Sequence, residues 1–548
     1  MAINLQEEQQ AELIRALREP TSYLHPVATV EVLETHISHV LLAGGFAYKF
    51  KKPLDLGFLD YSTLAARKFF CEEELRLNRR LAPHLYLEVT PIFGSSAAPR
   101  FVAEAGEASK ESIEYAVKMR RFAQEAQFDR MAACGMLRGE HIDSLAEVIA
   151  AFHQQIESAG ADTPYGTAPA IEAPMLQNFA QIRALLAEPE EIAELDRIEQ
   201  WSRREHGRCA ELFAARRAAG RVRECHGDLH LGNVAWLADE DAPGTAPRAV
   251  PFDGIEFSAN LRWIDVISEV AFLVMDLHAR CLANYANRFL NGWLERSGDY
   301  AGLALLDYYL VYRAMVRAKI ARIRAAQSDT GEAERQAALA DYARHIALAR
   351  GFGAPRRRAL ILMHGVSGSG KSVLAAALGE RIDAIRIRSD VERKRLHGLA
   401  ATARSHSGLA AGIYSKDATR ATYAELARLA RQILQSGGGC PVLVDACFLR
   451  AEERAAFSAL AGELGVPLLL VTCAADTAEL RRRVKLRHAT QMDASEADLA
   501  VLEHQLASAE ALDEPPSSGE LRIAVDTQQE ATAQSVERLV RTIATCPA

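Results

Sequence analysis

The chain has 548 residues, 49% of them hydrophobic and 25% charged, which is too long for one hydrophobic core and predicts two or more folded domains. Its net charge of −8 argues against a protein that relies on a broad basic surface to bind nucleic acid. The nine cysteines include no CxxC pair, and the acidic N-terminal segment and short apolar runs lack the features of a signal peptide or a bilayer span. We expect a soluble, cytoplasmic protein.

The first ~125 residues predict a small α+β lobe, in which antiparallel strands pack on one helix. Gly44-Gly45 separates two β-rich runs, and this spacing is typical of a hairpin. The expected elements, in chain order, are a helix over 1–20, strands over 35–44 and 46–53, a helix over 66–81, and strands at YLEVTPIF and EYAVKMRRF.

The pattern becomes mostly helical from Ser144 onward, with a block of strands and loops between Cys225 and Phe257. Beyond the segment 351–355, which contains glycine and proline, the apolar strands RALILMHG, CPVLVDACF and VPLLLVTCA alternate with helices. Such alternation is typical of a parallel sheet with helices on both faces. A domain boundary is therefore expected near residues 350–356.

The segment GVSGSGKS lies between an apolar strand and a helix, and it matches a phosphate-binding loop. In such a loop the glycines let backbone N–H groups turn toward phosphates, and the helix N-terminus adds positive potential. We expect Lys371 to reach the β and γ phosphates of ATP, and Ser372 to ligate Mg²⁺. The predicted nucleotide-binding residues are Gly365, Val366, Ser367, Gly368, Ser369, Gly370, Lys371 and Ser372.

Polar residues at the ends of later elements complete a candidate transfer site. Asp445 ends the buried strand VLVD and is the expected second metal contact. Asp390, with Arg393 three residues later, is suited to deprotonate an acceptor hydroxyl and to hold an anionic group. Arg483 and Arg487 lie four apart on one helical face, where they can neutralise a phosphoryl group during transfer.

From about residue 359 to about residue 511 the chain resembles the small-molecule P-loop kinases of the gluconate and shikimate kinase type. It also resembles the zeta toxins and the kinase half of polynucleotide kinases. In those families an aspartate at a strand end and an arginine three residues later act as base and substrate clamp, which implies these roles for Asp390 and Arg393. The arginines of their lid helix correspond to Arg483 and Arg487.

A second kinase-like set of residues occurs in the segment CHGDLHLGNVAW. Asp228 and Asn233 have the spacing of a kinase catalytic loop, and Asp253 follows in a Phe-Asp-Gly segment. We expect Asp228 to accept the proton of an acceptor hydroxyl, and Asn233 and Asp253 to ligate Mg²⁺ at the nucleotide phosphates. Glu256, three residues beyond Asp253, either supports this metal site or lies at the surface.

The chain between about residues 30 and 325 resembles the aminoglycoside phosphotransferase and choline kinase group. The resemblance implies that Lys49 on the third strand contacts the α and β phosphates and that a helix glutamate anchors it. Glu74 is the expected partner, because its helical face is the apolar one, and Glu73 is the alternative. The strand YAVKMRR resembles the hinge that contacts adenine, near residues 118–120. No G-x-G-x-x-G precedes Lys49.

The tandem order of the two halves resembles a family of predicted bifunctional bacterial proteins. It predicts an α+β protein-kinase-like (aminoglycoside phosphotransferase) domain, followed by an α/β P-loop kinase domain with a parallel sheet. The predicted extents are 1–352 for the first domain, with a small lobe at about 25–125 and a helical large lobe at about 126–352, and 353–548 for the second.

The predicted activity is that of a bifunctional phosphotransferase that uses ATP and Mg²⁺ and acts on a hydroxyl of a small or nucleotide-linked acceptor. Two alternatives stay open. The C-terminal domain phosphorylates a polynucleotide 5′-hydroxyl, with nucleic acid as its partner, or a UDP-sugar; or one half senses nucleotide and regulates the other. We expect no membrane partner, and the oligomeric state is left open.

Overall fold

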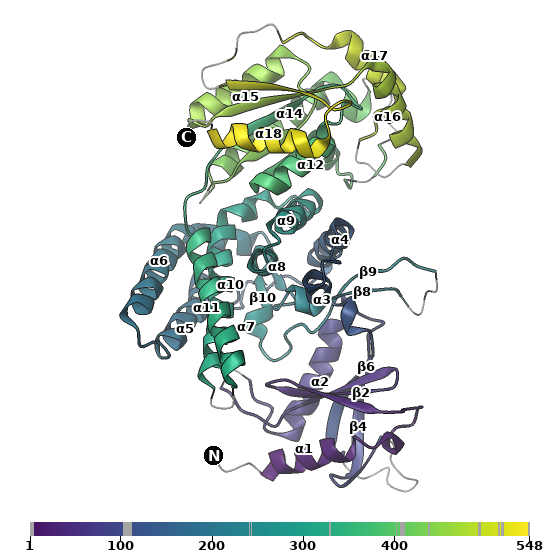
Figure 1. The fold of residues 1–548 in the computed structure, drawn as a ribbon, viewed down its shortest axis with the longest axis vertical. Coiled ribbons are helices and arrows are strands. Elements are labelled where there is room, and N and C mark those ends of the chain that lie inside the picture. Colours follow the sequence, from purple (N-terminus) through teal and green to yellow (C-terminus); the bar gives the residue numbers. More distant parts are fainter. Residues whose placement is uncertain are drawn as a thin grey trace. The chain divides into compact units, whose positions relative to one another are not determined.

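The structure is a computed structural model, and it describes residues 5–57, 59–101, 112–239, 242, 244–327, 330–401, 403–405, 411–436, 439–490, 495–512, 516 and 520–545. The chain divides into two compact units, and each is described by itself below (Figure 1). The first contains Met1–Pro174 and Ala210–Leu273, and the second contains Met175–Cys209 and Val274–Ala548. The limits of these compact units do not coincide with the domain boundary expected near residues 350–356, and that boundary stays a prediction.

A six-stranded antiparallel sheet organises the first unit within the described residues. Its strand order is β1-β2-β3-β6-β4-β5, and every neighbouring pair is antiparallel. Gly44-Gly45 forms the two-residue connection between the second and third strands, as the hairpin signal predicts. The strands are β1 (Val30–Glu34), β2 (Ser38–Ala43), β3 (Phe46–Lys51), β4 (Tyr86–Ser95), β5 (Ala98–Arg100) and β6 (Glu114–Arg120).

Strand β3 sends its side chains to both faces of this sheet, because successive side chains of a strand point in opposite directions. Tyr48 and Phe50 join an apolar cluster with helix α1 (Leu5–Ala16). Lys49 and Lys51 point to the other face, where they meet Glu74 of helix α2 (Leu64–Asn78). The alternation of the strand therefore places two lysines beneath one helix.

Two short antiparallel strand pairs carry the kinase-like motifs of the first unit. β7 (Val222–Glu224) pairs with β10 (Trp263–Asp265), and β8 (Val234–Leu237) pairs with β9 (Arg248–Pro251). The catalytic-loop sequence connects β7 to β8, and the Phe-Asp-Gly segment follows β9 directly. The helices here are α3 (Phe128–Ala133), α4 (Gly139–Gln155) and α7 (Ala259–Arg262), with short 3-10 turns at Pro20–Ser22, Gln124–Ala126 and Leu231–Asn233.

The second unit begins with long helices, in agreement with the helical pattern of the sequence. Helices α10 and α11 pack against each other, and α9 packs against the helix that follows the phosphate-binding loop. The helices are α9 (Ala283–Ser297), α10 (Leu303–Ala326) and α11 (Glu332–Phe352), with a 3-10 turn at Tyr300–Gly302. The division between the units falls within α5 (Ala168–Arg183), α6 (Pro189–Ala218) and α8 (Val266–Ala279).

A five-stranded parallel sheet in the order β12-β13-β11-β14-β15 completes the second unit within the described residues. One face of the sheet, including Ile361 and Met363, forms an apolar cluster with α12 and α18, which lie together in Figure 1. Leu360 and Leu362 point to the opposite face and are also buried, so both faces are covered. The strands are β11 (Leu360–His364), β12 (Ile385–Arg388), β13 (Val442–Asp445), β14 (Leu468–Ala474) and β15 (Glu520–Asp526).

The helices that surround this sheet alternate with its strands along the chain. They are α12 (Lys371–Ile382), α13 (Ser389–Leu396), α14 (Lys416–Leu434), α15 (Ala451–Leu464), α16 (Thr477–Thr490), α17 (Leu499–Ser508) and α18 (Thr532–Thr545), with a 3-10 turn at Gly412–Tyr414. Within the described residues, no helix has both the length and the apolar character that a bilayer crossing requires.

Helix α12 offers a direct test of this core. Leu374 is only 2% exposed and belongs to the apolar cluster, so Leu374→Ala is expected to leave a cavity and to destabilise the second unit by about 2–5 kcal/mol. Its neighbour Val373 is 65% exposed, and Val373→Ala is expected to change stability by no more than about 0.5 kcal/mol. Urea unfolding followed by circular dichroism measures both. Equal effects would contradict the packing described above.

Candidate active sites

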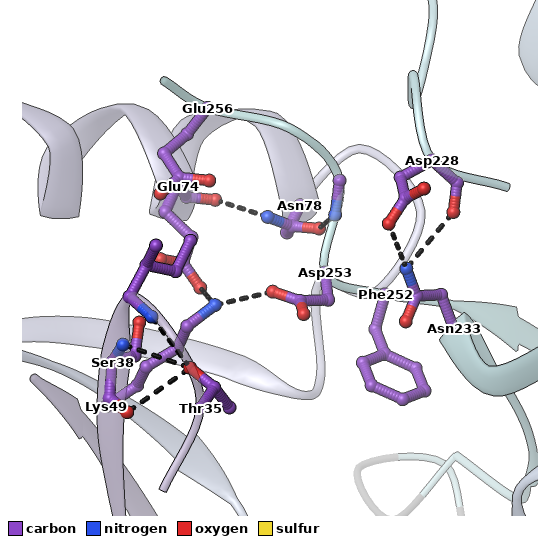
Figure 2. A network of polar contacts seen from close by, with 12 residues as sticks. Thr35, Ser38, Lys49, Glu74, Asn78, Asp228, Asn233, Phe252, Asp253 and Glu256 are labelled. Atoms are coloured by element: carbon purple, nitrogen blue, oxygen red, sulfur yellow. Dashed lines mark hydrogen bonds and ion pairs between the residues drawn. The ribbon is translucent and has the colours of Figure 1, made fainter. Parts of the chain in front are cut away.

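Two lysines of strand β3 share one glutamate of helix α2. Lys49 Nζ lies 2.9 Å from Glu74 Oε1 (Figure 2), and Lys51 Nζ lies 2.7 Å from Glu74 Oε2. Glu74 is fully buried, so its charge depends on these two partners. Glu73, the alternative partner, pairs instead with Arg76 at 2.9 Å. Lys51 was not singled out in the sequence, although its position two residues after Lys49 puts it on the same face of the strand.

Each lysine also contacts a carboxylate near the Phe-Asp-Gly segment. Lys49 Nζ lies 2.5 Å from Asp253 Oδ1. Lys51 Nζ donates a hydrogen bond to Glu256 Oε1, which also accepts one from the Tyr61 hydroxyl. The cluster thus contains two lysines and three carboxylates, which leaves one negative charge in excess. A negative surplus built from carboxylate oxygens fits a hard cation such as Mg²⁺.

The electrostatics of this cluster keep Lys49, Lys51 and Glu74 ionised. Burial alone would lower the pKa of Lys49 and of Lys51, but the neighbouring carboxylates outweigh burial and raise both pKa values well above the ordinary value. Burial would raise the pKa of Glu74, but the two lysines lower that pKa from 4.5 to about 2. Lys49 is therefore a permanent cation at neutral pH, as a phosphate contact requires.

The catalytic-loop residues lie together beside the Phe-Asp-Gly segment (Figure 2). Asn233 Nδ2 donates hydrogen bonds to the backbone oxygen of Asp228 at 3.0 Å and to Asp228 Oδ2 at 3.2 Å. The side chain of Asp228 is 37% exposed, so an acceptor molecule can reach it. The loop is tied to the Phe-Asp-Gly segment, because His226 Nε2 lies 2.8 Å from the Phe252 carbonyl and Ile255 N–H donates to the His226 carbonyl at 2.9 Å.

Asp253 adopts a backbone conformation that few non-glycine residues adopt, with φ of 61°. Its N–H donates a hydrogen bond to the Tyr86 hydroxyl at 3.0 Å, and the N–H of Gly254 donates to Asn78 Oδ1 at 2.8 Å. These bonds stabilise the unusual backbone and aim the carboxylate at Lys49. Strained backbone of this kind is frequent at functional sites.

The catalytic loop is also held from behind by a buried glutamate. Glu269 Oε2 accepts the N–H of Gly227 at 2.8 Å, and Glu269 Oε1 lies 3.0 Å from His153 Nε2. Gly227 has φ of 87°, and a side chain there would meet the Leu261 carbonyl at 2.9 Å. Burial would raise the pKa of Glu269, but the hydrogen bonds from His153 and Gly227 and the nearby histidines lower it.

Glu269 and His153 also have potential metal-ligand atoms within 4.8 Å of the Cys225 thiol, in the part of the chain that the structure describes. The group is completely buried, and its members already have hydrogen-bond partners. The Cys225 thiol donates to the Ile264 carbonyl at 3.6 Å, and both oxygens of Glu269 are engaged. These contacts indicate that the cluster stabilises the catalytic loop.

A cavity of about 520 Å³ lies between the β2–β3 turn and the segment after β6. It is lined by Glu31, Gly44, Gly45 and residues 121–125. The sequence predicts an adenine contact near residues 118–120, directly before the lining segment of this cavity, and this contact stays a prediction. Those residues end a strand that pairs on both sides, with Lys118 opposite both Tyr48 and Glu88, so their backbone groups are already used in the sheet.

The phosphate-binding loop of the second unit leads from the central strand β11 into helix α12. Gly365 has φ of 137°, and a side chain there would meet the Cys473 carbonyl at 2.5 Å, so only glycine fits. Lys371 Nζ donates to the Val366 carbonyl at 3.0 Å, within the loop itself. The N–H of Ser367 donates to Gln505 Oε1 of helix α17 at 2.7 Å. Gln505 was not singled out in the sequence, because no motif marks it.

Asp445 faces the start of α12 from the end of the neighbouring strand β13. Asp445 Oδ1 accepts a hydrogen bond from the Ser372 hydroxyl at 3.2 Å. Asp445 Oδ2 is buried and accepts no hydrogen bond from any of the described residues, and Arg388 Nε lies 3.7 Å from it. A serine hydroxyl beside a carboxylate oxygen without a hydrogen-bond partner fits Mg²⁺. Arg388 ends β12 opposite Asp445. It was not among the site residues expected from the sequence.

The proposed base and clamp lie on helix α13, at the end of strand β12. Asp390 is partly exposed, whereas Arg393 is 7% exposed and donates to the Ile413 carbonyl at 2.9 Å. The guanidinium of Arg393 lies over the ring of Tyr414, 5.1 Å from its centroid. Burial and the charge of Asp390 raise the pKa of Tyr414. Arg393 Nε and the Tyr414 hydroxyl are buried and make no hydrogen bond within the described chain.

The two lid arginines on helix α16 have different contacts. Arg483 Nη1 donates to the Gly368 carbonyl of the loop at 3.3 Å and to Thr527 Oγ1 at 2.9 Å. Arg487 Nη2 donates to the Ala497 carbonyl at 3.1 Å. The structure therefore brings Arg483 to the phosphate-binding loop, whereas Arg487 contacts the segment before α17.

Family models match both parts of the chain. The model described as "Phosphotransferase enzyme family" matches residues 69–246, and the model described as "AAA domain" matches residues 360–512. The first range contains Asp228 and Asn233 but not Lys49, and the second contains the phosphate-binding loop. Both parts are kinase-like domains, the second with the parallel sheet described above, which confirms the predicted fold class and the prediction of a kinase.

Relatives cover most of the chain. Uncharacterized proteins of Mycobacterium tuberculosis and Mycobacterium bovis are 31% identical over 474 residues, which is 86% of this chain and 89% of theirs. Among solved structures, amicoumacin kinase with AMP-PNP, Ca²⁺ and Ami is 15% identical, with a TM-score of 0.37 over 62% of this chain and 93% of that one. APS kinase of Mycobacterium tuberculosis with AMPPNP and APS is 20% identical, with a TM-score of 0.26 over 35% and 100%.

Glu74→Gln is expected to destabilise the first unit by about 3–5 kcal/mol at neutral pH, because two buried lysines would lose their shared counter-charge. Calorimetric thermal unfolding of the full chain measures the change. Glu73→Gln is the matched control on the same helix. Its partner Arg76 is half-exposed, so the expected change is no more than about 1 kcal/mol. Similar losses in both variants would contradict the central role of Glu74.

The lowered pKa of Glu74 also predicts a pH dependence. A carboxylate whose pKa falls from 4.5 to about 2 on folding contributes its full stabilisation above the unfolded-state pKa and loses it as pH drops through the folded-state pKa. The difference in stability between the wild type and Glu74→Gln is therefore expected to shrink between about pH 5 and about pH 2. A difference that stays constant over this range would exclude the assignment.

Proposed function

The chain belongs to the family of these mycobacterial proteins, and from its two kinase-like domains we propose that it is a bifunctional phosphotransferase that uses ATP and Mg²⁺. The proposal rests above all on the cluster of Lys49, Glu74 and Asp253 beside Asp228 and Asn233 (Figure 2). Each domain would move the γ-phosphate of ATP to a hydroxyl of a small or nucleotide-linked acceptor.

In the first site, Lys49 would contact the α and β phosphates while Glu74 fixes its ammonium group. Asp253 and Asn233 offer the carboxylate and amide oxygens that Mg²⁺ prefers, and an ion held there would supply positive charge to the phosphates. Asp228, which is partly exposed and held by Asn233, would accept the proton of the acceptor hydroxyl. The cavity beside residues 121–125 has the size for an adenine base.

In the second site, the loop from Gly365 to Ser372 would bind the phosphates through its backbone N–H groups and Lys371. Ser372 and Asp445 would hold Mg²⁺. Asp390 would act as the base, and Arg483, which already contacts the loop, would neutralise the phosphoryl group during transfer. Arg487 would have to leave the Ala497 carbonyl to take part.

The acceptor of the second site is proposed to be a small molecule with an anionic group beside its hydroxyl. Arg393 Nε and the Tyr414 hydroxyl are buried near Asp390 and lack hydrogen-bond partners among the described residues. Such groups cost free energy unless a bound molecule satisfies them. Because Arg393 is 7% exposed, a compact ligand fits this environment better than a polymer does.

A regulatory role for one half is the second candidate. No glycine-rich loop precedes Lys49, and Lys49 is ion-paired directly with Asp253, the expected metal ligand. A site closed in this way could bind nucleotide without transferring phosphate, and so act as a sensor.

Single substitutions separate the two activities. Asp228→Ala is expected to lower transfer at the first site by about 10²–10⁴-fold through loss of the base, and Lys371→Ala to lower transfer at the second by about 10²–10³-fold through loss of phosphate stabilisation. Turnover of radiolabelled ATP by the full chain measures both, and each variant serves as the control for the other. Retention of all turnover in both variants would sink the proposal. Selective loss with Lys371→Ala alone would favour the sensor role for the first half.

A screen for phosphate acceptors tests the proposed class. Radiolabelled ATP is offered with sugars, sugar acids, UDP-sugars and 5′-hydroxyl oligonucleotides, and transfer that needs Lys371 is scored. We expect label on small anionic hydroxyl compounds, with a KM for the acceptor raised about tenfold or more in Arg393→Lys, since a lysine cannot reproduce the forked contacts of arginine. Label on oligonucleotides only would assign the second site to a polynucleotide kinase instead.

A further inference from the structure

Helix α9 buries a row of polar side chains against the second unit's sheet. Asn287, Asn291 and Glu295 follow one another at four-residue spacing and are 5%, 6% and 8% exposed. Residues four apart share one face of a helix, so α9 presents a polar stripe to its neighbour. Buried polar groups are tolerated when they are hydrogen-bonded, and the partners of this stripe lie along strand β12.

The two asparagines satisfy the backbone at the sheet edge. β12 is the first strand in the sheet order and has a strand neighbour on one side, so its other side would leave backbone groups unpaired. Nδ2 of Asn287 and of Asn291 each donate to the Ala384 carbonyl at 3.0 Å. Asn291 Oδ1 accepts the N–H of Arg386 at 2.7 Å. Helix α9 therefore takes the place of a further strand.

Glu295 extends the stripe toward the P-loop site. Its Oε1 accepts hydrogen bonds from Arg386 at 2.6 and 3.0 Å, and its Oε2 lies 3.4 Å from Arg388 Nη1. Arg388 stands opposite Asp445 in the β12–β13 ladder, and its Nε is 3.7 Å from Asp445 Oδ2. That separation is longer than a hydrogen bond. One buried carboxylate thus holds the arginine that stands beside the expected metal contact.

We propose that Glu295 is a positioning residue of the P-loop site, which keeps Arg388 from bonding to Asp445 and so leaves Asp445 Oδ2 to the cation. This inference rests on the proposed function of that site. Without the charge of Glu295, Arg388 still has the Asp445 carboxylate beside it, and a charge-assisted hydrogen bond there would compete with Mg²⁺. Cation binding by the P-loop site therefore depends on a helix that precedes residue 353.

Binding of ADP to the full chain at a series of Mg²⁺ concentrations tests this inference. Titration calorimetry on each protein and on its Lys371→Ala counterpart isolates the binding that belongs to the P-loop site. Glu295→Gln is expected to raise the Mg²⁺ concentration for half-maximal ADP binding by about 10–100-fold, as is typical when a partner outside the ligand shell is lost. Adding Arg388→Gln is expected to restore the Mg²⁺ requirement of the wild type, because the guanidinium that competes with Mg²⁺ for Asp445 is gone.

Glu380→Gln is the matched control. Glu380 of α12 pairs with Arg288 of α9 at 3.0 Å, so this variant removes another ion pair of the same helix, and the Mg²⁺ requirement is expected to stay unchanged. Circular dichroism melting checks that each variant is folded. If Glu295→Gln does not fold, Arg388→Gln alone remains decisive, since it should need no more Mg²⁺ than the wild type.

Three results would overturn the proposal. They are an unchanged Mg²⁺ requirement in folded Glu295→Gln, a double variant that needs at least as much Mg²⁺ as Glu295→Gln, and a raised requirement in Arg388→Gln alone. The wild type distinguishes this failure from a failure of the proposed function. If its ADP binding does not depend on Lys371, the P-loop site itself is wrongly assigned, and the inference falls with it.

Discussion

A carboxylate is stable in a protein interior only when cations or hydrogen-bond donors surround it, and Glu74 meets this condition with Lys49 and Lys51. This requirement fixes much of the first unit. Helix α2 must lie over strand β3, and β3 must present two alternate residues to that helix. The same lysines then contact Asp253 and Glu256, so the segment after β9 is placed by charge as well as by its own backbone hydrogen bonds. Packing around one buried charge thus connects residues that are about 200 positions apart.

Backbone geometry shapes the candidate phosphate site of the second unit, whereas side-chain ion pairs shape that of the first unit. Its phosphate-binding loop contains Gly365, where only glycine fits, and the loop is set between a central strand and a helix N-terminus. The side chains around the loop then adjust charge. Ser372 and Asp445 meet at the end of the sheet. Arg388, which is ion-paired with Glu295, lies beside them. The two proposed phosphate sites of this chain therefore differ in what shapes them.

The local parts of both sites could be predicted from the sequence, because motif spacing and strand alternation are local properties. The phosphate-binding loop, the order of Asp228, Asn233 and Asp253, and the antiparallel and parallel sheets all follow from such patterns. The fold class is confirmed by the family matches, whereas the individual site roles stay predictions. Strand β1 was not predicted, since its polar and apolar residues give a weak signal.

The parts that could not be predicted depend on tertiary contacts. Nothing in the local sequence marks Glu256 as the partner of Lys51, or Glu295 as the partner of Arg386, because these pairs form only when distant elements meet. The adenine contact expected near residues 118–120 stays a prediction, and the pairing of β6 on both sides depends on a strand order that the sequence does not reveal. The helical face shared by Arg483 and Arg487 was visible, but their different acceptors, Gly368 and Ala497, were not.

The asparagines of α9 limit where this chain can be cut into fragments or split by gene fusion. A fragment beginning at residue 353 would contain the whole parallel sheet but would leave the Ala384 carbonyl and the Arg386 N–H without the partners that α9 provides. An uncovered strand edge is a template for pairing between molecules. We therefore expect such a fragment to self-associate, and we expect gene fusions that keep the P-loop half to carry α9 along with it.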